Sequence, residues 1–236
     1  MLAWVVSSVT SPPRRNGDMA KLIAVSIEAA PKKSFATAVD WPGWSRSGKT
    51  EALALEALAA YTDRYRKVAE LAGEAFPSRG GLTFEVVERV AGTGATSFGV
   101  PEVVTGQDRR PLDAATGDRL ARLVDAAWKT FGSTADVAPA ELRKGPRGGG
   151  RDTSRIVDHV FGADQGYAAN MGIKAKPFES ADRSSQRSLR AAMLEILRQP
   201  TDGSPIAGRK WTSRYAAHRI AWHALDHAWE IEDRIE

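Results

Sequence analysis

The hydrophobic pattern in the first part of the chain is typical of β-strands. In KLIAVSIEAA (21–30), KSFATAVDW (33–41) and LTFEVVERV (82–90), β-branched and aromatic residues recur at nearly every second position, the period with which a strand presents one face. A two-residue Pro-Lys connection joins the first two segments and predicts a hairpin. Pro42-Gly43 predicts a turn, and the following WSRS is a short third strand candidate. Four strands are therefore expected before residue 91.

A helix is predicted between the third and fourth strands. From Glu51 to Ala72, apolar residues follow three- and four-residue spacing, which aligns them along one face of a helix. They are Leu53, Leu58, Tyr61, Tyr65, Val68 and Ala72. Pro77, Gly80 and Gly81 end this pattern. The predicted order is β-β-β-α-β, with the helix covering one face of the sheet.

Beyond residue 110 the pattern changes to helical spacing throughout. Four segments show it, separated by loops that contain Gly or Pro: 117–131, 152–171, 179–198 and 213–236. Four helices of this length predict an antiparallel bundle around a common core. The sequence therefore predicts an α+β protein that ends in an all-α four-helix bundle.

The change of pattern also predicts domain boundaries. The β-β-β-α-β domain spans residues 19–92, a linker rich in Gly, Thr and Pro spans 93–110, and the bundle spans 111–236. Residues 1–18 are expected to be a disordered extension, because the segment MAKLIAVSIE, which begins at Met19, reads like the start of the folded domain. The first residues lack the basic start and cleavage site of a secretory signal, which favours a cytoplasmic protein.

Composition narrows the possible chemistry. The chain has 236 residues, 42% hydrophobic and 26% charged, and a net charge of +4 with 33 basic residues interspersed among 29 acidic ones. This mixture favours an ordinary solvated surface over a nucleic-acid-binding one, and a small anionic ligand is compatible with it. No window approaches 18 apolar residues, so no membrane span is expected. Because there are no cysteines, any metal site must use histidines and carboxylates.

GWSRSGKT (43–50) matches the phosphate-binding loop pattern G-x-x-x-x-G-K-[ST] at every position. In that mechanism backbone N–H groups surround the phosphates, Lys49 reaches the terminal phosphates and Thr50 holds magnesium. Phosphate-loop enzymes also need further parallel strands alternating with helices, and only one strand follows here. We therefore favour a structural interpretation, in which Gly43 and Gly48 form turns and Thr50 caps the helix.

Three of the four histidines, His218, His223 and His227, lie in the last predicted helix. At about 100° per residue, His223 and His227 are about 40° apart on one face and one turn from each other. His218 lies about 140° from His223 and cannot join the pair. Small and apolar residues share the face of the pair, so we expect it to face the bundle core.

The fourth histidine, His159, is in the predicted second helix of the bundle, on the side of Ile156, Ala163 and Tyr167. We expect this apolar stripe to face the core as well and to bring three imidazoles together. Three histidine ligands leave coordination positions open, as in catalytic sites, and imidazole suits zinc, nickel or ferrous iron. The alternative is a histidine pair that is only exposed or hydrogen bonded.

Glu230 is a candidate for a chemical role beside the histidines. It lies about 20° from His223 around the helix, where it could orient a ligand or act as a base. The alternative is that it only forms an ion pair with a neighbour such as Arg234.

A basic loop precedes the predicted second helix of the bundle. In LRKGPRGGGRD (142–152), Lys144, Arg147 and Arg151 are interleaved with glycines. Cations, backbone N–H groups and the helix dipole could bind an anion there. The alternative is a flexible basic loop.

The second predicted helix of the bundle contains one histidine, His159 in IVDHVFGADQGY, and the fourth contains an H-x-x-x-H pair, His223 and His227 in HALDHAWEIEDR. This arrangement resembles the DinB superfamily of metal-binding four-helix bundles. The resemblance covers residues 111–236. It implies a three-histidine divalent metal site, often in a homodimer, and transferase or isomerase chemistry with a low-molecular-weight thiol. The metal would bind the thiol as a thiolate and lower its pKa, which makes it nucleophilic at neutral pH.

The N-terminal part, with DWPGWSRSGKTEALALEALAAY after two strands and before a fourth, resembles HicB-like domains over residues 21–92. The matching residues are Asp40, Pro42, Gly43, Gly48 and Thr50. Such domains serve as antitoxins or interaction modules, but no helix-turn-helix or ribbon-helix-helix segment accompanies this one.

Two classes of function follow from these features. The leading hypothesis is a metal-dependent transferase or isomerase acting on a small-molecule substrate in the bundle, using a low-molecular-weight thiol, with the N-terminal domain shaping access or association. The alternative is a non-enzymatic binding protein, in which the HicB-like module engages a protein or nucleic acid and the bundle is a scaffold with a vestigial metal site.

Overall fold

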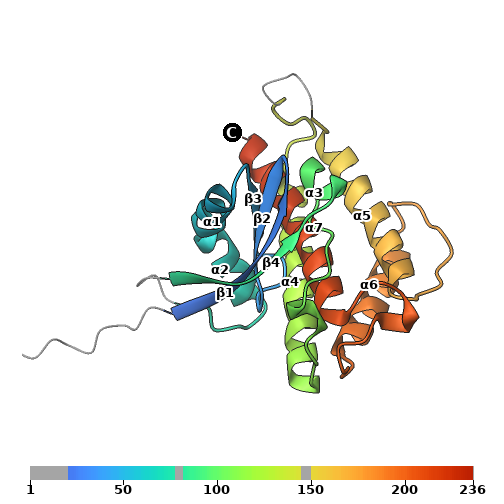
Figure 1. Ribbon diagram of the computed structural model, residues 1–236. Helices are drawn as coiled ribbons and strands as arrows, with labels where there is room; N and C mark the ends of the chain where they lie inside the picture. The colour runs from blue at the N-terminus through green and yellow to red at the C-terminus, as the bar shows by residue number, and fades with distance from the viewer. Residues whose placement is uncertain (1–20, 78–81, 145–149, 236) are drawn as a thin grey trace, which may run out of the picture.

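The computed structural model describes residues 21–77, 82–144 and 150–235 of the chain. It contains a four-stranded sheet followed by long helices (Figure 1), which confirms the predicted α+β class. The extension predicted for residues 1–18 lies outside the described residues.

The sheet has the strand order β3-β2-β1-β4. β1 (Lys21–Ala30) and β2 (Lys33–Ala38) form the predicted antiparallel hairpin, and β3 (Ser45–Gly48) pairs antiparallel with β2. β4 (Leu82–Ala91) returns beside β1 and runs parallel to it. The predicted β-β-β-α-β order is therefore confirmed.

The two faces of the sheet differ in chemistry. Since successive residues of a strand point to opposite faces, the register of β1 and β2 groups Val25, Ile27, Ala36 and Ala38 on one face and Ser26, Glu28, Phe35 and Thr37 on the other. Helices α1 (Glu51–Ala60) and α2 (Thr62–Leu71) lie on one side of the sheet and the long helices on the other (Figure 1). The second, more polar face meets the last helix, where Phe35 contacts the ring of Trp222 edge to face.

The helix predicted from 51 to 72 consists of two helices, which Tyr61 separates with φ −92° and ψ 5°. Leu58, Tyr65, Val68 and Ala72 of the predicted stripe are buried, but Leu53 is 45% exposed. The prediction for Leu53 was wrong because α1 carries alanine or leucine around its whole circumference, so spacing alone could not select the buried side.

The segment Gly43–Thr50 has the structural role favoured above. Gly43 has φ +90°, and a Cβ atom there would lie 2.7 Å from Cδ1 of Leu225. At Gly48 a Cβ atom would lie 2.4 Å from the backbone nitrogen of Ala54. The hydroxyl of Thr50 accepts the N–H of Leu53 at 3.2 Å and so caps α1. Residues 45–48 of the motif form the strand β3 rather than a loop, and the strand before the motif, β2, is antiparallel to both of its neighbours, unlike the parallel strand that precedes a phosphate loop.

The four predicted long helices are present as α4 (Ala114–Val137), α5 (Thr153–Asn170), α6 (Arg183–Arg198) and α7 (Ser213–Ile235), with a 3-10 turn, η2 (Ile206–Gly208), before the last. The start of α4 lies beside the end of α6, where Leu112 and Thr201 form a bridge. The ends of α4 and α7 are joined by a hydrogen bond from the N–H of Arg143 to the carbonyl of Arg234. The helices α4 and α7 therefore run in one direction, and α5 and α6 in the other.

The segment 93–110, predicted as a linker, packs along the sheet. It includes the short helix α3 (Gly94–Phe98) and a 3-10 turn, η1 (Gln107–Arg109). Four of its backbone N–H groups donate to the carboxylates of Glu28 and Glu88. Buried hydrophobic residues of the sheet unit and of the bundle form one continuous cluster, so the two parts share a core.

Candidate metal centre

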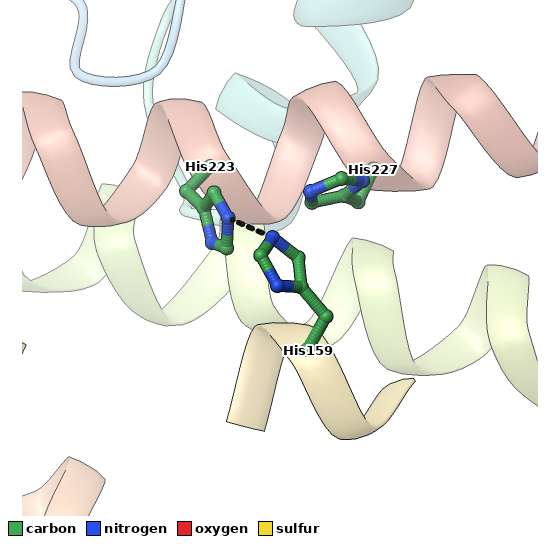
Figure 2. A group of neighbouring side chains, drawn as sticks. All are labelled: His159, His223 and His227. Carbon is green, nitrogen blue, oxygen red and sulfur yellow. Dashed lines mark hydrogen bonds between the residues drawn. The ribbon is translucent and has the colours of Figure 1, made fainter. Parts of the chain in front are cut away.

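Three histidine side chains meet between α5 and α7 (Figure 2). His223 and His227 extend from α7 one turn apart, and His159 faces them from α5. Their ring centroids are 4.7 to 5.0 Å apart. One nitrogen of each ring lies within 4.8 Å of the other two, so the predicted group is close enough to bind a metal ion.

The nitrogen geometry fits a shared ion. Nε2 of His159 lies 3.1 Å from Nε2 of His223. Two nitrogens that bind one tetrahedral zinc ion, each at about 2.0–2.1 Å, are about 3.3 Å apart. The pair is thus already near the spacing of two ligands, and a ring nitrogen of His227 lies within 4.8 Å of both.

Burial keeps the central ligand neutral. His223 is only 6% exposed, and burial lowers its pKa to about 2. Partial desolvation of the ring also lowers the pKa of His159, with the positive charge of Arg151 as the next cause. Because a metal binds the neutral imidazole, these lowered pKa values favour the form of each ring that can bind a metal.

The position of His159 differs from the prediction. We expected it in the core with Ile156, Ala163 and Tyr167, but its side chain is exposed while Ile156 and Tyr167 are buried. His159 lies at the edge of the apolar stripe, one turn from Ile156, so its ring reaches His223 from the solvent side. The group is therefore accessible to solvent on the side of His159.

Glu230 contacts a predicted ligand directly. The Nδ1–H group of His227 donates to Oε2 of Glu230 at 2.7 Å, and Nη1 of Arg234 donates to the other carboxylate oxygen at 3.0 Å. The hydrogen bond from His227 lowers the pKa of Glu230. With its proton held on Nδ1, His227 presents the Nε2 lone pair to the centre. From the sequence, we treated orienting a ligand and pairing with Arg234 as alternative roles for Glu230. In the structure one carboxylate oxygen contacts His227 and the other contacts Arg234.

Arg234 is itself held by the chain before α5. Its Nε donates to the carbonyl of Arg143 and its Nη1 to the carbonyl of Arg151, both at 2.8 Å. This series of contacts connects His227 to the segment that leads into α5, the helix that carries His159. The two sides of the centre are thus tied together by polar contacts as well as by packing.

The two described cations of the predicted basic loop, Lys144 and Arg151, have different neighbours. Lys144 pairs with Asp152 at 2.8 Å, and Arg151 is exposed near the histidines. Arg147 lies outside the described residues. An anion site formed by Lys144, Arg147 and Arg151 stays a prediction.

Tyr167 is a neighbour of the centre that the sequence suggested only as a core residue. Its ring meets that of His223 edge to face at 5.6 Å, and burial raises its pKa. Its position could have been noticed in the sequence, because it follows His159 by eight residues, about two helical turns, on the same side of the helix. Tyr167 forms part of the wall beside the buried ligand.

The fold and the site together define an α+β protein with a candidate three-histidine centre in its helical part. Comparison of the chain with protein-family models, with curated proteins and with solved structures finds no match. Among the described residues, no helix combines the length and the apolar composition that crossing a membrane would require.

Proposed function

We propose that this protein is a metal-dependent small-molecule transferase or isomerase with a divalent ion bound by His159, His223 and His227. The observation that carries the proposal is the convergence of three imidazoles at a site exposed on the side of His159. Three protein ligands with an open position are the arrangement of catalytic centres, whereas structural sites are closed by four. Zinc, nickel and ferrous iron are the ions that suit such ligands.

When bound, the ion would supply a positive charge that lowers the pKa of a thiol at its open position. Since the chain has no cysteine, this thiol must be a separate small molecule. The resemblance of residues 111–236 to DinB bundles supports a low-molecular-weight thiol as the co-substrate.

The residues around the centre have distinct roles in this proposal. His223 supplies a buried, neutral nitrogen, and Glu230 fixes the ring of His227 by accepting its Nδ1–H. Glu230 is held in turn by Arg234 and so acts as a positioning residue rather than as a base. Tyr167 covers His223 on the inner side, which leaves the side of His159 for substrate.

The packing of the N-terminal sheet supports an enzyme more than a separate HicB-like interaction module. Its polar face lies against α7, the helix that carries two of the three ligands, and the two parts share a core. In this proposal the sheet holds α7 in place and shapes access to the centre.

Metal analysis of the purified protein tests the proposal. We expect about one divalent ion per chain, and its loss from a His159→Ala variant whose circular dichroism is unchanged. In the cobalt-substituted protein, addition of 2-mercaptoethanol should produce a thiolate-to-metal charge-transfer band. A chain that takes up no divalent ion, even after reconstitution, would rule out the metal centre. Metal binding without the thiolate band would reject the thiol chemistry alone.

A further inference from the structure

A pocket separate from the three histidines lies between the polar face of the sheet and α7. Its lining includes Glu28 and Thr37 of the sheet, Pro101 and Val103 of the segment after α3, and His218 and Trp222 of α7. None of the three histidines of the metal centre lines it. The cavity measures about 40 Å³, within about 510 Å³ of empty space that includes its opening to solvent. It lies where the two parts of the molecule meet, a common place for ligand sites.

His218 lines this pocket and carries an unpaired hydrogen-bond acceptor. Its Nε2 lies 2.9 Å from the carbonyl of Val39, and since a carbonyl only accepts, Nε2 carries the proton. Burial lowers the pKa of His218, so the ring is neutral and Nδ1 has a free lone pair. Nδ1 is buried and has no hydrogen-bond partner within the described part of the chain.

Trp222 offers a donor beside it. Its side chain is 5% exposed, and its Nε1–H group is buried without a partner among the described residues. His218 and Trp222 are four residues apart on α7, so they are neighbours on one face of the helix. Because buried polar groups in folded proteins are nearly always hydrogen bonded, this acceptor and donor indicate a bound molecule that satisfies both.

The charges around the pocket disfavour a charged ligand. The carboxylate of Glu28 already accepts from the hydroxyl of Thr96 and from two backbone N–H groups. Asp108, also in the lining, accepts from the hydroxyl and the N–H of Thr105. A cation would have to compete with these donors. An anion would meet two carboxylates, against the single guanidinium of Arg219, which lies over the rings of Tyr167 and Trp222.

We propose that this pocket binds a small, flat, uncharged molecule whose polar end carries adjacent donor and acceptor groups, as a primary carboxamide does. The cavity has room for about three water molecules, which is the size of a carboxamide group with its three heavy atoms. The amide N–H would donate to Nδ1 of His218, and the carbonyl would accept from Nε1–H of Trp222. The apolar body would lie against Pro101 and Val103, which also line the pocket. This site is independent of the metal centre.

Three isosteric probes test the proposal: benzamide, benzoate and benzamidine, which differ in charge but hardly in shape. The ¹⁵N-labelled full chain is titrated with each, and the indole N–H resonance of Trp222, assigned by its loss in Trp222→Phe, is followed. We expect a saturable shift with benzamide, at least about tenfold weaker binding of both charged probes, and no dependence on added metal. Absence of a saturable shift, or equal or tighter binding of either charged probe, would overturn the proposal.

A pair of tryptophan variants provides the matched control. Trp222→Phe keeps an aromatic ring but removes the donor, so ligand-observed NMR should show about 3- to 10-fold weaker binding of benzamide. Trp211→Phe changes a tryptophan that does not line the pocket and should leave the affinity unchanged. Circular dichroism and metal content should be the same in both variants and in the parent. Equal affinities for benzamide in the two variants would contradict the assigned contact.

Discussion

Helix α7 carries buried imidazole nitrogens on two faces, and the two faces use them differently. On the side of the sheet, the ring of His218 is held by the backbone carbonyl of Val39. On the side of α5, the ring of His223 meets a second imidazole, that of His159. Burial lowers the pKa of both rings, so both are neutral and both are able to bind a metal. What separates them is the partner across the interface: among the described residues, the group close enough to share a metal ion lies on the face toward α5.

Alanine substitutions of the two histidines test this difference and should have the largest effect. His223→Ala removes the buried ligand, so metal affinity should fall by more than the roughly 100-fold that loss of an outer partner of a ligand can cause. His218→Ala should keep the metal stoichiometry of the parent, although it loses a hydrogen bond to the sheet. Inductively coupled plasma mass spectrometry after dialysis measures the metal, and circular dichroism checks the fold. Equal metal loss in both variants would mean that burial, not the facing imidazole, defines the site.

The face of α7 toward the sheet is closely packed against Gly43. Gly43→Ala places a methyl group at φ +90° and within 3 Å of Leu225 and Ala221. Gly73→Ala is a matched control, because Gly73 also has positive φ (+72°) but no atoms within 4 Å of an added Cβ. Each should lose about 1–2 kcal/mol for the backbone conformation, and Gly43→Ala about 1–3 kcal/mol more for overlap.

Urea denaturation of the two glycine variants measures that difference. If Gly43→Ala and Gly73→Ala lose the same free energy of unfolding, the close contact between the turn and α7 is not a source of stability. A larger loss in Gly43→Ala than in Gly73→Ala, with an unchanged metal content, would show that the sheet stabilises α7 independently of the metal centre.

Glu230 supports the metal face from outside the ligand set, so its substitution should have an intermediate effect. Glu230→Gln keeps the shape but weakens the acceptor for the Nδ1–H of His227, and metal affinity should fall about 10- to 100-fold. Asp226→Asn is the matched control: it precedes His227 directly but pairs with Arg46 of the sheet. Competition with a chromophoric chelator gives both affinities. A fall of equal size in Asp226→Asn would assign the effect to helix charge rather than to the hydrogen bond.

From the sequence we could predict which residues of α7 face α5 and form the candidate metal group. The contacts on the opposite face, toward the sheet, could not be predicted. The spacing of His223 and His227 is local and follows from helix geometry, and the structure shows both beside His159. The exposure of His159 could not be predicted. The boundary between core and solvent falls within one turn of α5, and the spacing of Ile156 and Tyr167 does not show on which side of it His159 lies.

No pattern within a single segment of the sequence predicts the pocket on the sheet side. It forms only where β1, β2, the segment after α3 and α7 come together, and these elements are widely separated in the chain. His218 could be excluded from the metal group by its angle around the helix, but its actual partner, the carbonyl of Val39, lies 179 residues away. Such a backbone contact depends on how the sheet docks, which the hydrophobic pattern does not specify.

The smallest predicted effect concerns the segment Gly43–Thr50, which joins the sheet to α1. Thr50→Ala removes the acceptor for the N–H of Leu53 and should lower the free energy of unfolding by about 1 kcal/mol, as for other helix caps. Thr50→Ser keeps the hydroxyl and should restore most of it. Lys49→Ala is the control for a phosphate loop: with no role in the cap, it should leave stability unchanged, and isothermal titration with ATP and magnesium should show no binding to the parent. Tight ATP binding that Lys49→Ala abolishes would instead make this segment a nucleotide-binding site and would contradict the structural role assigned to it.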